Sequence, residues 1–159
     1  MSKKYPIGLQ DFEKIRKGNF LYLDKTMYIH RMVEQTGYFF LSRPRRFGKS
    51  LLIDTIQALY ESKQSLFEGL FIANKWDWRK QNPVVRISFS NIGHKEKGLV
   101  KALQDSLDES AHKFNLSLKE EHISLKFKEF SYPCYPFDVT SMCLLISGSQ
   151  VRILSGSPL

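Results

Sequence analysis

The sequence lacks the apolar segments that direct a protein into or across a membrane. Its first residues, MSKKYPIGLQ, have no apolar core of the kind that secretory signals carry. No run of apolar residues is long enough to cross a lipid bilayer. These absences exclude a membrane-spanning class and lead us to expect a cytoplasmic protein with no membrane partner.

The sequence also has few residues that could bind a structural metal or form disulfides. Its two cysteines, Cys134 and Cys143, have no metal-ligand spacing with any histidine. Without an export signal, two reduced thiols are the simpler interpretation, and a Cys134–Cys143 disulfide is the alternative. Surface or helix-face positions are expected for the scattered histidines, which are His30, His94, His112 and His122.

Charge is scarce at the C-terminal end of the chain. Residues 131–159 contain only two charged side chains, Asp138 and Arg152, and are rich in Ser, Pro and Gly. We therefore expect two parts, a domain over residues 1–130 and a separate tail over residues 131–159. The tail is expected to hold one strand and a disordered end, or no folded element.

The rest of the chain is ordinary in length and strongly basic. Its 159 residues are enough for one domain with a buried core. The formal net charge is +8. Such a charge favours anionic partners, namely nucleotides, nucleic acid or an acidic protein surface, and does not choose among them.

Strand-like and helix-like segments alternate before residue 130. Apolar residues at helical spacing mark the helix-like segments, and short aromatic or β-branched runs mark the strand-like segments. Helices are expected over residues 11–17, 25–36, 50–62, 94–114 and 117–130, and strands or extended segments over 19–24, 38–42 and 83–90. This alternation predicts an α/β layered domain.

The segment RPRRFGKS, residues 43–50, lies between an expected strand and an expected helix. That is the context which a phosphate-binding loop requires, because the start of the helix attracts an anion. Gly48 can adopt a positive φ and admit a phosphate. The Lys49 ammonium can reach the terminal phosphates, and the Ser50 hydroxyl can bind Mg²⁺.

The start of the segment departs from the usual phosphate loop. Arg43 stands where the first glycine of that motif is expected. Pro44 can set the turn instead, which brings Arg43, Arg45 and Arg46 near the phosphates. Phe47 completes the candidate loop. The alternatives are a basic connector that contacts nothing and a basic module that binds nucleic acid.

Several separated motifs resemble one known family. They are PIGLQDFEKIR, YLDKT, FFLSRPRRFGKS and WDW, over roughly residues 5–130. Together they are similar to the AAA-ATPase-like proteins of bacteria and some archaea, which resemble AAA and STAND-type P-loop ATPases and often carry a PD-(D/E)XK nuclease-like domain downstream. That family's loop also reads RPRRFGKS, so the resemblance implies that Arg43 to Ser50 bind ATP, with Lys49 on phosphate and Ser50 on Mg²⁺.

Hydrolysis by this family needs acidic residues after a second buried strand, and the chain lacks them. The resemblance leads us to expect an apolar run ending in DEYD, whereas PVVRISFS ends in serine and CLLISGSQ in Ser, Gly and Gln. Glu120, Glu121 and Glu129 are interpreted as solvated. We therefore expect a P-loop NTPase-like partial parallel sheet flanked by helices and truncated before the acidic (Walker B) strand.

Two further expectations follow from this truncation. The tail is read as a product of truncation or frame-shift, and the domain as hydrolytically weak or inactive. A homo-oligomer is possible, because the strand over residues 38–42 is expected to lack a neighbour. Trp76 and Trp78 are interpreted as packing anchors, with base stacking as the alternative.

Overall fold

A computed structural model gives the architecture of the chain. It describes residues 3–35, 37–42, 44, 46–80, 84–88, 99–113, 117, 119, 122, 124–126, 143–147 and 151–155. The helices are α1 (Phe12–Lys17), α2 (Thr26–Glu34), α3 (Lys49–Tyr60) and α5 (Leu99–Lys113), with two 3-10 helices, η1 (Gln64–Phe67) and η2 (Phe71–Asn74). The strands are β1 (Gly37–Leu41), β2 (Val84–Ser88), β3 (Cys143–Ser147) and β4 (Val151–Ser155).

The described strands form one sheet with the order β1-β4-β3-β2. The β2–β3 pair is parallel, whereas β4 runs antiparallel to both β1 and β3. Only residues 148–150 separate β3 from β4, which is too short a connection for a parallel crossover. The sheet is therefore mixed, where the sequence predicts a partial parallel sheet.

The tail contributes more regular structure than its composition suggests. The sequence predicts at most one strand after residue 130, but β3 and β4 both lie there. In β4, Val151, Ile153 and Leu154 are β-branched or apolar residues of the kind that favour strands. Strand β4 forms hydrogen bonds with β1 on one side and with β3 on the other. The sequence of this short segment alone does not reveal these partners.

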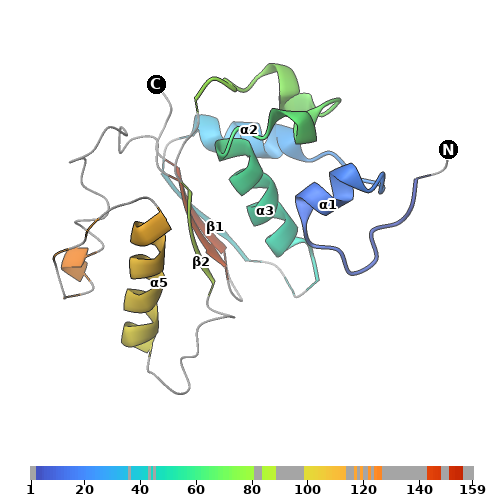
Figure 1. The fold of residues 1–159 in the computed structure, drawn as a ribbon. Helices are drawn as coiled ribbons and strands as arrows, with labels where there is room; N and C mark the ends of the chain where they lie inside the picture. The colour runs from blue at the N-terminus through green and yellow to red at the C-terminus, as the bar shows by residue number, and fades with distance from the viewer. Residues whose placement is uncertain are drawn as a thin grey trace.

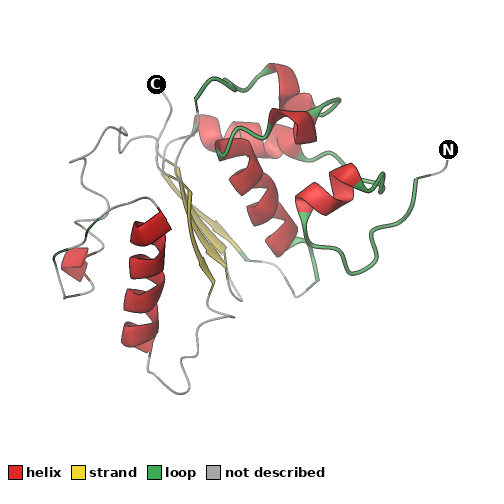
Figure 2. Ribbon diagram, in the orientation of Figure 1, coloured by secondary structure: helices red, strands yellow, loops and turns green. Residues whose placement is uncertain are grey.

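Helices cover both faces of the sheet (Figures 1 and 2). Helix α5 lies on one face, and α1, α2 and α3 lie on the other. Among the described residues, no helix has both the length and the apolar character needed to cross a membrane.

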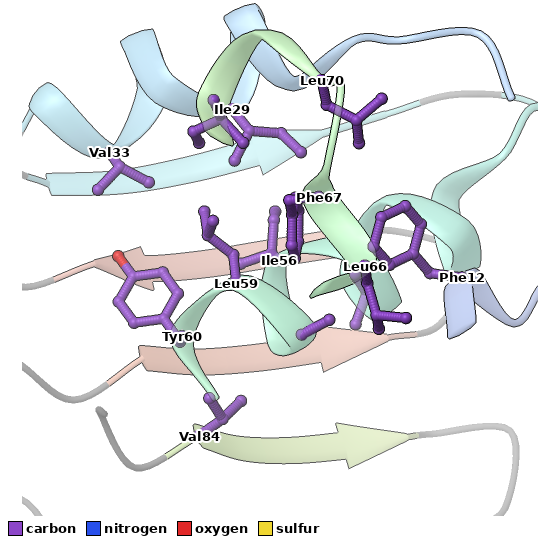
Figure 3. Close-up of a cluster of buried hydrophobic side chains, with 13 residues drawn as sticks. Phe12, Ile29, Val33, Ile56, Leu59, Tyr60, Leu66, Phe67, Leu70 and Val84 are labelled. Carbon is purple, nitrogen blue, oxygen red and sulfur yellow. The ribbon is translucent and has the colours of Figure 1, made fainter. Parts of the chain in front are cut away.

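The main core lies between α3 and its neighbours (Figure 3). The apolar stripe predicted for α3 is confirmed, because Ile53, Ile56 and Leu59 are fully buried. Other members of the core come from α1, α2, the 3-10 helices and the segment between them, and β2, namely Phe12, Ile29, Val33, Leu66, Phe67, Leu70, Ile72 and Val84. This packing fixes α3, and with it the loop that precedes α3.

The WDW segment packs against that core. Trp78 donates its ring N–H to the Ala73 carbonyl at 2.7 Å, and its ring centroid lies 5.2 Å from that of Phe67. Trp76 meets Tyr60 edge to face, with centroids 5.3 Å apart. The interpretation of both tryptophans as packing anchors is therefore confirmed.

Two expected elements differ from the sequence prediction. Residues 19–24 form no strand, and only an isolated bridge joins Phe20 to Lys4. Within the expected helix over 117–130, the described residues 124–126 are helical. Several residues that the sequence singled out lie outside the described residues, namely His94, Glu120, Glu121, Glu129, Cys134 and Asp138.

Candidate functional site

The candidate loop ends where helix α3 begins. Gly48 is the residue that caps the helix, with φ 74° and ψ 18°, which is the left-handed region that favours glycine. The Leu52 N–H donates to the Gly48 carbonyl at 2.9 Å and closes the first turn. Lys49 and Ser50 are therefore the first two helical residues, and Gly48 lies outside the helix.

The N-terminal end of α3 has no acidic or capping side chain of its own among the described residues. No side chain in the described part of the chain caps it, and its first turn contains no acidic residue. Helix starts present free N–H groups and a partial positive charge, which a negative group stabilises. Apart from its chain neighbours, no atom of the described residues lies within 4 Å of the place where a Cβ would stand on Gly48, so none of them blocks close approach to the backbone there.

Arg46 adds a second left-handed residue to the loop. Its φ is 69°, which is uncommon for a residue with a Cβ and costs about 1 kcal/mol. Arg46 and Phe47 are both exposed, and 62% of the Phe47 surface is accessible. The strained conformation directs the chain around the turn between β1 and α3.

The Lys49 side chain folds back over the loop. Its Nζ donates to the Pro44 carbonyl at 2.8 Å. This hydrogen bond is exposed, so water or another acceptor can replace the carbonyl at small cost. The Lys49 ammonium therefore lies over the loop.

The structure brings most of the predicted site residues together. Pro44, Arg46, Phe47 and Gly48 form the turn, and Lys49 and Ser50 open the helix. Both Lys49 and Ser50 are half-buried. The remaining two predicted residues, Arg43 and Arg45, lie outside the described residues.

No acidic residue that could assist Ser50 with a metal is available on the described part of α3. Asp54 lies one turn beyond Ser50, but both of its oxygens are engaged. Oδ2 accepts the Phe12 N–H at 2.7 Å, and Oδ1 accepts from Arg86 at 3.1 Å. The described residues contain no group of three or more His, Cys, Asp or Glu side chains that could hold a metal ion.

The sequence analysis missed the role of Asp54. The carboxylate joins the start of α1, the middle of α3 and strand β2, and Arg86 also donates to Gln57 on α3 at 3.1 Å. One signal was present in the sequence, since Asp54 interrupts an apolar helical stripe. Its partners are 42 and 32 residues away, so the pattern did not identify them.

The YLDKT segment has a structural role in this molecule. Asp24 Oδ1 accepts from the Thr26 N–H at 2.8 Å and from the Thr26 hydroxyl at 2.7 Å. Asp24 Oδ2 accepts the Phe71 N–H at 2.7 Å. The buried Thr26 hydroxyl in turn accepts the Ile72 N–H at 3.3 Å. We call Asp24, Thr26, Phe71 and Ile72 the Asp24 latch, since it joins the start of α2 to η2.

The latch also affects the charge state of Asp24. Partial burial raises the pKa of this carboxyl, but hydrogen bonds from Phe71 and Thr26 outweigh that effect. The pKa of Asp24 is therefore lowered from its ordinary value, and the carboxylate form is the stabilising one. The geometry favours a structural role over a chemical role for this motif, because its side chains join the start of α2 to η2.

Comparison with known proteins places the chain in a family. A relative from Azotobacter chroococcum mcd 1, described as "Uncharacterized protein in vnfD 5'region", is 46% identical over 104 residues, which is 65% of this chain. The match covers 19% of that relative, so the chain spans about a fifth of its length. No solved structure matches the chain.

The family match is longer than the resemblance in the sequence suggests. The pattern of the family described as "Predicted AAA-ATPase" matches residues 6–147. The matched range passes residue 130, where the resemblance in the sequence ends, and ends with β3. The chain belongs to this predicted AAA-ATPase family.

Proposed function

We propose that the chain is a P-loop domain that binds ATP with Mg²⁺ through residues 43–50 and the start of α3. The observation that carries this proposal is the open, uncapped helix start behind a left-handed Gly48. Membership of a predicted AAA-ATPase family supports a nucleotide as the anion. The P-loop NTPase-like fold and the ATP and Mg²⁺ requirement are parts of the same proposal.

The glycine, the lysine and the arginines of the loop each have a defined task in this proposal. The first-turn N–H groups and the backbone at Gly48 would receive phosphate oxygens. The Lys49 ammonium would leave the Pro44 carbonyl and bind the terminal phosphates, which are stronger acceptors because they are charged. Arg46, together with Arg43 and Arg45, would add positive charge around the phosphates.

The residues present fit magnesium only in part. Ser50 would supply a hydroxyl ligand, and magnesium would neutralise charge on the phosphates when bound. Asp54 is committed to Phe12 and Arg86, so it would not orient a water molecule. We therefore propose ATP binding with weak or absent hydrolysis.

The experiment compares binding of a fluorescent ATP analogue by the wild type, Lys49→Ala and Lys17→Ala. Lys17 lies on α1 in an exposed ion pair with Glu13, so its replacement removes the same charge away from the loop. We expect Lys49→Ala to weaken binding about tenfold or more, the cost of one charge-assisted hydrogen bond. Lys17→Ala should bind like the wild type. Equal binding by all three proteins would contradict the proposal.

A basic nucleic-acid-binding module is the alternative function. The exposed Arg46 and the net charge of +8 are the features that favour it. Such a module would bind DNA or RNA with a steep dependence on salt and would be indifferent to ATP. Titration of labelled DNA at several salt concentrations, with and without Mg-ATP, distinguishes the two functions.

A further inference from the structure

Phe47 is the single aromatic residue among residues 42–50, and 62% of its surface is accessible. The described residues around it in the loop, Pro44, Arg46 and Gly48, are exposed as well. Single exposed apolar residues are normal on a protein surface, so exposure alone indicates no function. Its place in the turn and the charges near it distinguish Phe47 from other exposed aromatic residues.

The backbone holds Phe47 in a defined place beside the start of α3. Arg46 and Gly48, on either side of it, have φ values of 69° and 74°, so two left-handed residues enclose it. Gly48 caps α3, whose apolar side is fixed in the main core. The Phe47 Cα is therefore only about 3.8 Å from the Cα of the helix cap. A group bound at the start of α3 would lie within reach of the Phe47 side chain.

Packing on the helix is the ordinary role of an apolar residue at this position. An apolar residue directly before a helix cap often covers the fourth residue of the helix, which is Leu52 here. Such a contact removes apolar surface from water, whereas more than half of the Phe47 surface remains accessible. Phe47 also lies outside the main core that the described residues form. The ring thus keeps most of its surface free for a ligand.

We propose that the Phe47 ring stacks on the base of the bound nucleotide, so that the loop binds nucleoside triphosphates more tightly than inorganic triphosphate. This inference rests on the proposed function, in which the first turn of α3 receives the phosphates. A nucleotide held there by its phosphates keeps its sugar and base outside the packed core, where Phe47 is exposed. Stacking needs one accessible aromatic face and no hydrogen-bond partner, so a lone ring is sufficient.

The charges around Phe47 favour a nucleotide over an apolar partner. Residues 35–53 contain four basic side chains and no acidic one, the basic ones being Arg43, Arg45, Arg46 and Lys49. An apolar partner would use the ring but not the positive charge, and inorganic phosphate would use the charge but not the ring. A nucleotide uses both. Proteins that bind single-stranded nucleic acid stack successive bases on several aromatic residues, whereas residues 42–50 offer one.

Calorimetric titration with Mg-ATP and with magnesium tripolyphosphate tests this proposal. We expect Phe47→Ala to weaken ATP binding about tenfold, as for one lost base stack, and to leave tripolyphosphate binding unchanged. GTP should lose about as much as ATP, because every base has a stacking face. Phe47→Trp should bind ATP like the wild type, since its ring still stacks. Tyr28→Ala is the matched control, because Tyr28 is 63% exposed on α2, outside the loop, and should bind both ligands like the wild type.

Lys49→Ala separates failure of this inference from failure of the proposed function, since it should weaken both ligands. If it does so while Phe47→Ala weakens neither ligand, or weakens both equally, the role of Phe47 is overturned and the phosphate site is retained. If Lys49→Ala changes neither ligand, the proposed function and the role of Phe47 are both overturned. Binding of a labelled oligonucleotide that depends on Phe47, with ATP binding that does not, would assign the ring to nucleic acid and overturn the inference.

Discussion

Replacement of Asp24 by asparagine should destabilise the fold by breaking the Asp24 latch. Asparagine can still accept from Thr26, but its amide nitrogen would face the Phe71 N–H in place of Oδ2. A hydrogen bond to a charged group contributes about 1.5–3 kcal/mol. Asp24 is exposed, so water can satisfy the freed N–H, and we expect a loss of about 1 kcal/mol.

The assay is thermal unfolding at several pH values. For a chain of this size, a loss of about 1 kcal/mol lowers the Tm by about 2–4 °C. The folded pKa of Asp24 is below its ordinary value, so its contribution is complete above the unfolded pKa, which is about 3.9. The contribution is lost as the pH falls through the folded pKa. The gap between wild type and Asp24→Asn should therefore close in acid.

Asp77→Asn is the matched control for this experiment. Asp77 also accepts a backbone N–H and a side-chain donor, but both belong to Arg79, two residues away on the surface. It joins no distant segments, so its replacement should leave the Tm unchanged at neutral pH. Our reasoning fails if the two variants lose equal stability, or if the gap for Asp24→Asn does not narrow as the pH falls below the ordinary pKa of about 3.9.

Three further substitutions test side-chain contacts and backbone strain by urea unfolding. Arg16→Met should lower the free energy of unfolding by about 1–3 kcal/mol, because Arg16 donates to the Leu66 and Glu68 carbonyls at 2.7 and 2.6 Å. A loss of stability no larger than that of Lys17→Met would contradict this prediction. Gly48→Ala should cost about 1–2 kcal/mol through backbone strain, since its Cβ would meet no atom of the described residues within 4 Å, its chain neighbours apart. Gly18→Ala should cost more, since its Cβ would lie 2.8 Å from the Lys14 carbonyl oxygen, and the reverse order would refute the comparison.

Local sequence patterns predicted the elements that depend on local chemistry. Helix α3 was predicted from its apolar stripe, and the strand before it from a short aromatic run. The turn at Gly48 was also predicted locally, because glycine adopts a positive φ without the steric cost that other residues have. These features depend on residues within one or two turns of one another.

Features that depend on distant partners were not predicted. Strand β4 is stabilised by pairing with β1, more than a hundred residues earlier in the chain. Asp24 reaches Phe71 across 47 residues. Within the candidate site, the contact of Lys49 with Pro44 depends on the strained turn at Arg46, which no residue preference indicates. Side-chain chemistry identified which residues belong to the candidate site, but not how these residues are arranged.

The contacts of the Asp54 carboxylate limit how this protein can be cut into stable fragments. It binds segments that begin at Phe12 and end at Arg86, so any fragment cut between them leaves a half-buried negative charge without one of its counterparts. A shortened version that stops before β2 would be expected to disturb the helix bearing Lys49, even though every residue of the loop is retained. The smallest autonomous unit thus extends at least from α1 through β2.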